Sequence, residues 1–238
     1  MKNLIFIFLV IPLLHFSSCT NLEKSDVLLI TGGHSFDTTE FFDLFYSLEN
    51  INLDTISQPA ANDFLVTDEG KNYDIYVFYD MWRTITGEQK KAYLELTEAG
   101  KGFVFLHHSL VSYNAWDEFK NLVGGRYHEP LPGKDSSLYS NYKHDIDLYV
   151  NVLDPTHPVT ETMSNFIIHD EGYGNLDLTP DIQPLLTTDH PDCHPVVSWT
   201  NLYNNSKVVY LIFGHDKKAY ESAEFKELIV NAIDWVEE

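Results

Sequence analysis

The sequence predicts an α/β fold in which helices cover a mostly parallel sheet. The first observation is that apolar, strand-like runs alternate with helix patterns through the first half of the chain. This alternation is typical of right-handed β-α-β crossovers. The second observation is the continuous apolar run Phe103–Leu106, the pattern of a strand buried on both faces of a sheet. The third is that several runs end in polar residues, as strands do at a ligand-binding edge.

Four strands and three helices are expected in the first half of the chain. Gly32 and Gly33 allow a tight turn after the first strand. The first two helices each begin with a capping box, Asp37–Glu40 and Thr86–Gln89, and Gly100 stands where the glycine after a helix belongs. The expected strands cover residues 26–31, 53–57, 73–79 and 102–106, and the third helix covers residues 113–123.

The second half departs from this alternation. Residues 126–144 are rich in Pro, Gly, Ser, Tyr and Lys and predict a long excursion, a feature that is usually functional or mobile. Residues 145–152 alternate partly, as an edge or antiparallel strand does, and Asp154–Val159 predicts a turn. Further strands are expected at residues 166–173, 183–187, 196–199 and 207–213, and an amphipathic helix at residues 224–236.

The N-terminal segment is expected to lie outside the folded domain, which covers residues 26–238. Lys2 and the apolar stretch Leu4–Leu14 predict a secretory signal over residues 1–18. The apolar stretch is too short for a helix that spans a membrane, which needs about 20 residues.

A lipid anchor is expected directly after this signal. Ser17 and Ser18 precede Cys19, as small residues do in a bacterial lipobox. We therefore expect Cys19 to be lipidated and residues 19–25 to form a tether. The expected location is the cell envelope of a Gram-negative bacterium, in the periplasm or on the outer-membrane surface. The alternative is an ordinary cleaved signal or an uncleaved anchor.

The chain is strongly acidic, with a formal net charge of −21 at pH 7. This charge argues against nucleic acid as a partner and against binding to anionic lipid or phosphorylated substrates. Contact with a membrane is expected only through the lipid anchor. A neutral small molecule such as a sugar fits better, because the 14 Tyr and four Trp residues offer rings on which sugars can stack.

Polar residues that could take part in catalysis or binding follow the ends of several predicted strands. His34 follows the first strand, Asp80 the third, His107–His108 the fourth and His215 the last. The carboxyl ends of parallel strands share one edge of a sheet, so we expect these residues to meet. The segment His169–Glu171 adds a further polar group. A lone histidine is more often structural, but several at matching strand ends indicate a functional site.

Two kinds of chemistry could use this set of residues. A divalent metal such as zinc takes neutral imidazoles or carboxylates, although no compact ligand motif is present. The possible ligands are His34, His107, His108, Glu171 and His215, of which we favour His34, His107 and His215. Metal-free catalysis would use a histidine as base and a carboxylate as acid. Asp170 and Glu171 point to opposite faces of an extended chain, so only one should face the site. The same holds for the two adjacent histidines, unless the chain turns between them.

Eight short motifs follow one another in a specific order. They are Leu28–His34, Val77–Asp80, Gly100–His108, Trp116–Phe119, Leu122–Gly125, Asp154–Val159, Asp170–Tyr173 and Phe213–Asp216. Together they resemble the ThuA-like (trehalose utilisation) family over nearly all of residues 26–238. The resemblance implies a class I glutamine amidotransferase-like fold, which is a flavodoxin-like three-layer α/β sandwich. The second half of this chain should add antiparallel strands to it.

Relatives with this fold usually carry a nucleophilic cysteine directly after the strand that matches Phe103–Leu106. Here that place holds His107, His108 and Ser109, and Ser109 lacks the G-x-S-x-G pattern of a nucleophilic serine. The resemblance therefore argues against glutamine hydrolysis. It implies instead a substrate among disaccharides or oxidised glycosides of the 3-keto type.

A 3-keto group acidifies the neighbouring C2–H, so that a base can remove this proton and the anomeric group can depart. We expect His107 or His108 to be the base and Glu171 or Asp170 to assist the leaving group. His34 and His215, with or without a metal between them, would stabilise the enediolate oxygen.

The residues expected to bind the sugar are His34, Asp80, Trp82, Trp116, Tyr173 and His215. The first alternative to an enzyme is a non-catalytic sugar-binding lipoprotein that passes sugars to a transporter. The second is a subunit of an envelope complex whose pocket no longer functions.

Overall fold

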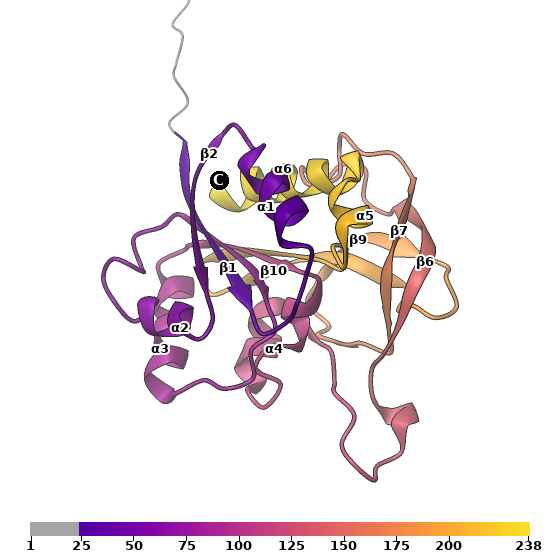
Figure 1. Cartoon of the computed structure of the whole chain (residues 1–238), viewed down its shortest axis with the longest axis horizontal. Helices are drawn as coiled ribbons and strands as arrows, with labels where there is room; N and C mark the ends of the chain where they lie inside the picture. The colour runs from indigo at the N-terminus through magenta and orange to yellow at the C-terminus, as the bar shows by residue number, and fades with distance from the viewer. Residues whose placement is uncertain (1–23) are drawn as a thin grey trace, which may run out of the picture.

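The computed structural model describes residues 24–238 (Figure 1). The predicted signal over residues 1–18, the predicted lipidation site Cys19 and most of the predicted tether lie outside the described residues. Among the helices of the described part, none has the length and apolar character that a membrane crossing requires.

A nine-stranded sheet forms the middle of the molecule. Its strands are β1 (Ser25–Gly32), β2 (Ile51–Ser57), β3 (Ile75–Asp80), β4 (Gly102–Leu106), β6 (Asn141–Val152), β7 (Phe166–Gly174), β9 (Gln183–Thr188), β10 (Val196–Tyr203) and β11 (Ser206–Leu211). They are paired in the order β2-β1-β3-β4-β11-β10-β9-β6-β7. Two short strands, β5 (Gly125–Arg126) and β8 (Asp177–Leu178), pair separately.

The direction of the strands divides this sheet into two parts. Neighbours from β2 to β11 are parallel, whereas neighbours from β11 to β7 are antiparallel. Four antiparallel pairings separate β11 from β7, so β7 runs in the same direction as the parallel strands. The predicted α/β fold, with a mostly parallel sheet and extra antiparallel strands in the second half, is confirmed.

Helices cover both faces of the sheet. They are α1 (Thr38–Tyr46), α2 (Ala60–Phe64), α3 (Gly87–Glu98), α4 (Asp117–Val123), α5 (Lys217–Tyr220) and α6 (Ala223–Glu237), with short 3₁₀ turns η1 (His107–Val111) and η2 (Ser136–Leu138). Figure 1 shows α1, α5 and α6 on one face and α2, α3 and α4 on the other. This arrangement is the three-layer sandwich that the resemblance implied.

Of the two predicted capping boxes, one is confirmed and the other is wrong. The capping box of Thr86 and Gln89 forms as predicted at the start of α3. The box predicted at Asp37 is wrong, because the Asp37 carboxylate accepts a hydrogen bond from the backbone N–H of Lys217 (3.0 Å) and not from its own helix. The third predicted helix begins at Asp117 rather than at residue 113, because Tyr113 has a positive φ of 48°.

Aromatic packing fixes the strand that delivers the two adjacent histidines. All residues of β3 and β4 are buried. The rings of Phe78 and Phe105 stack across the two strands at a centroid distance of 4.7 Å, and Phe119 of α4 meets Phe105 edge-on. Burial of each such side chain contributes about 2–3 kcal/mol. The carboxyl end of β4 is therefore a rigid starting point for the residues that follow it.

Asp80, which we expected to bind sugar, is buried on the wrong side of the sheet for that role. Successive strand residues point to opposite faces: the ring of Tyr79 stacks on Phe41 of α1, whereas the Asp80 carboxylate accepts hydrogen bonds from Gln58 (2.9 Å) and Ser112 (3.4 Å). Burial raises the pKa of Asp80 to about 7, although both hydrogen bonds oppose the shift. Asp80 thus belongs to the packing beneath α2.

We predict that Asp80→Asn changes how the stability of the protein depends on pH. The folded state holds the Asp80 proton up to about pH 7, whereas the unfolded chain releases it near pH 4. The raised pKa of Asp80 therefore makes its full contribution to the free energy of unfolding below pH 4. This contribution falls by about 1.4 kcal/mol per pH unit as the pH rises to 7. Relative to the wild type, Asp80→Asn should gain stability over this range.

Urea denaturation at pH 5 and pH 7.5 measures this difference. Asp68 is exposed, so Asp68→Asn is the matched control and should follow the pH dependence of the wild type. Parallel stability curves for Asp80→Asn and the wild type would show that Asp80 is already ionised in the folded protein.

Candidate active site

Two neighbouring parallel strands bring His107 and His215 together. Strands β4 and β11 pair in parallel, and Leu106 lies opposite Leu211. Both chains therefore leave the sheet side by side: β4 continues into His107, and β11 continues through Gly214, whose φ of 109° favours glycine. The prediction that these strand ends share one edge is confirmed for this pair.

His107 occupies a sharp turn at the end of β4. Its φ of 45° lies in the left-handed region, which non-glycine residues rarely adopt. Because the chain turns here, both His107 and His108 line the same pocket, although they are adjacent in sequence. The Nδ1 atom of His107 lies 2.6 Å from the carbonyl oxygen of Ile212. A carbonyl only accepts, so Nδ1 carries the proton and, in the neutral ring, Nε2 carries the lone pair.

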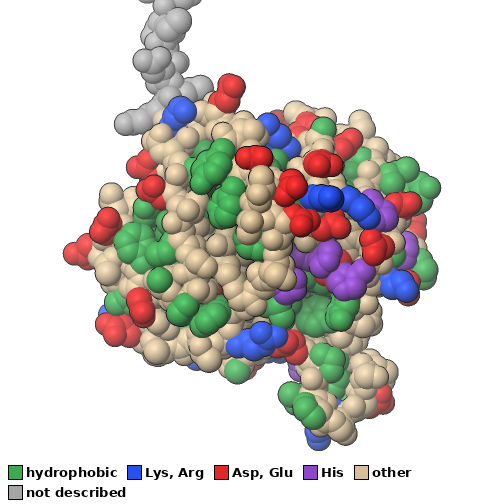
Figure 2. Space-filling view, viewed as in Figure 1, with side chains coloured by type: hydrophobic (Ala, Val, Ile, Leu, Met, Phe, Trp, Pro, Cys, Tyr) green, Lys and Arg blue, Asp and Glu red, His purple; other side chains and the backbone are tan. Residues whose placement is uncertain are grey.

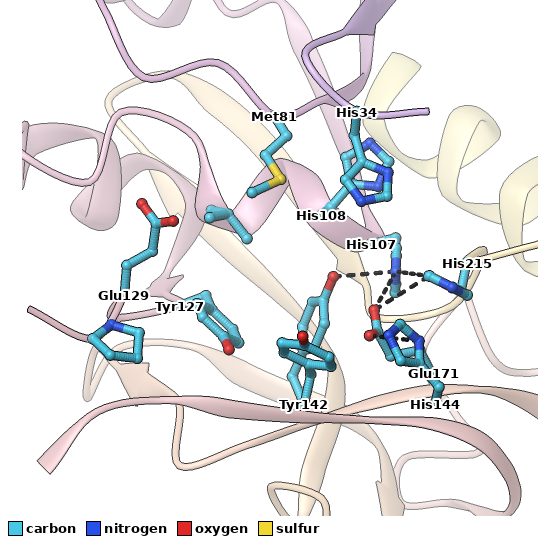
Figure 3. Close-up of a pocket in the computed structure, with 13 residues that line it drawn as sticks. His34, Met81, His107, His108, Tyr127, Glu129, Tyr142, His144, Glu171 and His215 are labelled. Atoms are coloured by element: carbon cyan, nitrogen blue, oxygen red, sulfur yellow. Dashed lines mark hydrogen bonds and ion pairs between the residues drawn. The ribbon is translucent and has the colours of Figure 1, made fainter. Parts of the chain in front are cut away.

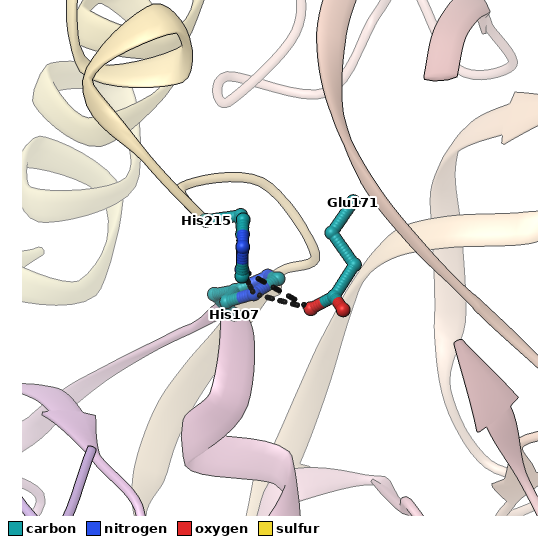
Figure 4. Close-up of side chains that lie close together, drawn as sticks. All are labelled: His107, Glu171 and His215. Carbon is teal, nitrogen blue, oxygen red and sulfur yellow. Dashed lines mark hydrogen bonds and ion pairs between the residues drawn. The ribbon is translucent and has the colours of Figure 1, made fainter. Parts of the chain in front are cut away.

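The side chains of Glu171 and His215 meet that of His107 at this lone pair (Figure 4). The Nε2 atom of His107 lies 3.0 Å from Oε2 of Glu171 and 3.3 Å from Nδ1 of His215. The same Glu171 oxygen lies 3.3 Å from Nδ1 of His215. The hydroxyl of Tyr173 lies 3.1 Å from Nε2 of His107. These three residues, His107, Glu171 and His215, form a group whose ligand atoms could hold a metal ion.

The predicted metal ligand His34 does not belong to this group. Its ring lies beside His108, with a centroid distance of 4.8 Å, and 6.4 Å from the ring of His215. Its Nδ1 lies 2.7 Å from the carbonyl oxygen of Ser35. Glu171, also a possible ligand from the sequence, completes the group in place of His34, because β7 returns to the end of β11 through the antiparallel half of the sheet.

Histidines hold both oxygens of the Glu171 carboxylate. Its Oε2 faces His107 and His215, and its Oε1 lies 3.0 Å from Nδ1 of His144. Burial alone would raise the pKa of Glu171, but the close approach of His107 and His215 outweighs burial and holds this pKa well below its usual range. The hydrogen bond to Glu171 is also the main reason why the pKa of His215 is raised.

Asp170 is a positioning residue and does not line the pocket with the histidines. Its carboxylate accepts three backbone N–H bonds, from Gly214 (2.8 Å), His215 (2.9 Å) and Glu171 (2.8 Å). Burial raises its pKa, and these bonds together with the nearby His107 oppose the shift. With all three N–H groups bound to it, Asp170 fixes the backbone of two of the converging residues. Of the two carboxylates that we expected to take part in catalysis, Glu171 is the one that lines the cavity.

His108 is buried between aromatic rings. Its ring lies 4.2 Å from that of Tyr79 and 4.8 Å from that of His34. Neither of its ring nitrogens has a hydrogen-bond partner among the described residues. Burial, followed by the repulsion of His107 and His34, lowers its pKa well below the usual value. His108 is thus an uncharged residue in the lining of the pocket.

These residues line a cavity of about 320 Å³, a volume in the range of small-molecule sites. Figure 2 shows the histidine side chains gathered beside acidic groups on one part of the visible face. Figure 3 shows the interior of the same cavity. Its lining consists of His34, Met81, His107, His108, Val111, Tyr127, Glu129, Pro130, Tyr142, His144, Glu171, Tyr173 and His215.

Two tryptophans that we expected to bind sugar do not line this cavity. Trp116 precedes α4, where its ring packs against Phe119 and is 9% exposed. Trp82 lies two residues after Asp80, and its backbone N–H donates to the hydroxyl of Ser112 (3.0 Å). The rule that residues after a strand face the ligand fails here, because the chain directs only Met81 of this segment into the cavity.

Other lining residues were missed because they lie in the long excursion or next to it. His144 enters the cavity where β6 is irregular between Lys143 and Ile146, and Asp145 has a φ of 53°. Tyr127, Glu129, Pro130 and Tyr142 come from the same stretch of chain. The sequence signal was the unusual length of the excursion, which indicated function but not which residues carry it.

The fold and the site define a class of protein. The molecule is a three-layer α/β sandwich with a mostly parallel sheet, in which a histidine-rich pocket lies at the end of the central strand β4. The chain belongs to the ThuA family, described as trehalose utilisation, whose family model matches residues 26–236. Membership of this family supports a role related to carbohydrates.

Solved structures of similar fold agree with this assignment. A ThuA-like protein from Parabacteroides merdae has a TM-score of 0.74 at 19% identity, over 90% of each chain. A ThuA-like protein from Bacteroides uniformis has a TM-score of 0.67 at 20% identity, over 91% of this chain and 92% of the other. A β-galactosidase from Bacillus circulans contains the fold in 31% of its chain, with a TM-score of 0.57 at 14% identity over 90% of this chain. No curated protein matches the sequence.

We predict that Asp170→Asn destabilises the protein by about 1–3 kcal/mol, measured by chemical denaturation. Asparagine has one acceptor oxygen in place of two, so at least one buried backbone N–H loses its partner. Asp192 is exposed in a nearby loop, and Asp192→Asn should change the stability by less than about 0.5 kcal/mol. Equal stabilities for the two variants would contradict the positioning role of Asp170.

Proposed function

We propose that the pocket binds a divalent metal and acts on oxidised glycosides or disaccharides of the 3-keto type. The observation that carries this proposal is the convergence of His107, Glu171 and His215 in a cavity lined by aromatic rings. Family membership supports the carbohydrate part of the proposal. The lipid anchor and the envelope location remain predictions from the sequence.

The distances between the three donor atoms fit a zinc-like ion. Two ligands at 2.0–2.1 Å from a tetrahedral zinc lie about 3.3–3.4 Å from each other. The three distances within the group are 3.0, 3.3 and 3.3 Å. Two imidazoles and one carboxylate are also a usual donor set for catalytic zinc, which keeps one position open.

The surroundings of these donors support the same assignment. Metal-binding histidines usually donate their second N–H to a carbonyl or carboxylate, as His107 does to Ile212. The carboxylate of Glu171 is held from behind by His144. His107, Glu171 and His215 would thus hold the ion, and a metal bound there would polarise the 3-keto oxygen of the sugar.

His34 is the residue best placed to act as the base. It lines the cavity and is exposed. Its Nδ1 donates to the carbonyl oxygen of Ser35, so in the neutral ring Nε2 carries the lone pair that accepts a proton. We expected His107 or His108 to be the base from the sequence, but both are less suited to this role. The lone pair of His107 points at Glu171 and His215, and His108 is buried.

The proposed reaction is an elimination from the 3-keto sugar. The base takes the C2 proton, the electrons of the C2–H bond form the C1–C2 double bond, and the C1–O bond to the leaving group breaks. The leaving oxygen regains one proton, which His34 can return because C1 and C2 are adjacent. The products are an unsaturated keto sugar and the free alcohol, and no oxidant or reductant is consumed.

The first test concerns the metal. We expect the wild-type protein to bind one zinc ion per chain and His215→Ala to bind it at least 100-fold more weakly, measured by elemental analysis and calorimetry. His190 lies outside the cavity lining, so His190→Ala is the control and should keep the affinity of the wild type. Equal zinc affinity in both variants would remove His215 from the metal site.

The second test concerns the base. We expect His34→Gln to reduce turnover of a methyl 3-keto-glucoside by about 10²–10⁴-fold, because glutamine cannot accept the proton. Zinc binding by the same variant should persist, since His34 lies outside the ligand group. A loss of less than tenfold would exclude His34 as the base. Saturable sugar binding without any product in the wild type would favour the alternative, a non-catalytic sugar-binding protein.

A further inference from the structure

The cavity has two ends with different chemistry. Figure 3 shows His107, His215 and Glu171 on one side of the view and Tyr127 and Glu129 on the other, with Tyr142 between them. The second end contains no histidine among its labelled residues. Among the side chains drawn there, the hydroxyls of Tyr127 and Tyr142 make no hydrogen bond. The reaction described above uses only the first end.

Hydrogen bonds at the base of the excursion, residues 126–144, hold the second end of the cavity in place. The backbone N–H of Ser140 donates to the carbonyl of His128 (3.0 Å), and the backbone N–H of His128 donates to the hydroxyl of Ser140 (2.9 Å). The hydroxyl of Ser140 in turn donates to the carbonyl of Asn175 (2.8 Å). This clasp between His128 and Ser140 joins the chain next to Tyr127 with the chain next to Tyr142.

Arg83 fixes the direction of the Glu129 carboxylate. Its guanidinium donates through Nε to Oε2 (3.2 Å) and through one terminal nitrogen to Oε1 (2.6 Å). Such a paired contact sets the geometry of the carboxylate and leaves each oxygen with a further lone pair. Glu129 can therefore accept hydrogen bonds from hydroxyl groups in the cavity.

The charge of the lining selects the ligand. Glu129 and Glu171 are the acidic side chains of the cavity wall, and no lysine or arginine is among the lining residues. Arg83 offsets the charge of Glu129, so this end presents little net charge, and a phosphate or carboxylate would gain little attraction there. A neutral ring with several hydroxyls would instead donate to Glu129, exchange hydrogen bonds with the tyrosine hydroxyls and stack on their faces.

We infer that Tyr127, Glu129 and Tyr142 form a second subsite, which binds a neutral polyhydroxylated ring attached to the sugar at the metal-side end. The preferred ligand is then a disaccharide rather than a glycoside with a small leaving group. This inference rests on the proposed function for the location of the reacting sugar. Glu129 is its specificity-determining residue.

The test compares two unoxidised ligands by calorimetry, trehalose and methyl α-D-glucopyranoside, which differ by the second ring. We expect the wild type to bind trehalose at least tenfold more tightly than the methyl glucoside. Glu129→Gln should reduce this ratio about tenfold and Tyr127→Phe about threefold, since each removes a hydrogen-bonding group. Glu49 is exposed and outside the cavity lining, so Glu49→Gln should keep the ratio of the wild type.

The inference is overturned if the wild type binds the two ligands equally well, if it binds neither, or if Glu129→Gln keeps the wild-type ratio. The result is separate from the test of the proposed reaction, because neither ligand carries the 3-keto group. If the protein does not turn over keto sugars but prefers trehalose in a way that depends on Glu129, the proposed elimination is rejected. The inference of the second subsite then still stands.

Discussion

The buried carboxylate of Asp170 is the contact on which the site depends. It binds the N–H groups of Gly214 and His215 after β11 and that of Glu171 within β7. These segments are four strands apart in the sheet, so one side chain joins its parallel half to its antiparallel edge. Without this contact nothing in the strand pairing would require Glu171 to face His107. The negative charge is buried, and three N–H donors offset much of the cost of burial.

The turn at His107 supplies the second requirement. A positive φ at this residue places both adjacent histidines in the cavity, and the hydrogen bond to Ile212 decides which nitrogen of His107 carries the lone pair. The tautomer is therefore set by the backbone of the neighbouring strand. Here the turn directs an imidazole towards Glu171 and His215.

The sequence predicted the strands well because their signal is local. Runs such as Phe103–Leu106 are typical of a buried strand, and the helix patterns between the first four strands predicted their parallel arrangement. The partners of His107 depend instead on how the antiparallel half of the sheet curves back, which no local pattern encodes. Asp80 and Trp116 show the opposite error, since both follow or flank predicted elements but pack into the interior. A position after a strand end was therefore not sufficient for a place in the site, and Glu171, which lies within β7, shows that it was not required.

The clasp between His128 and Ser140 separates two parts of the excursion. Tyr127, Glu129 and Tyr142 lie close to the clasp, whereas the segment from Leu131 to Leu138, with both leucines more than half exposed, extends beyond it. Insertions or deletions in that outer segment would leave the geometry of the cavity intact. The excursion is therefore modular. Its outer segment can be exchanged, in evolution or by design, to change the contacts of the protein surface without changing the cavity.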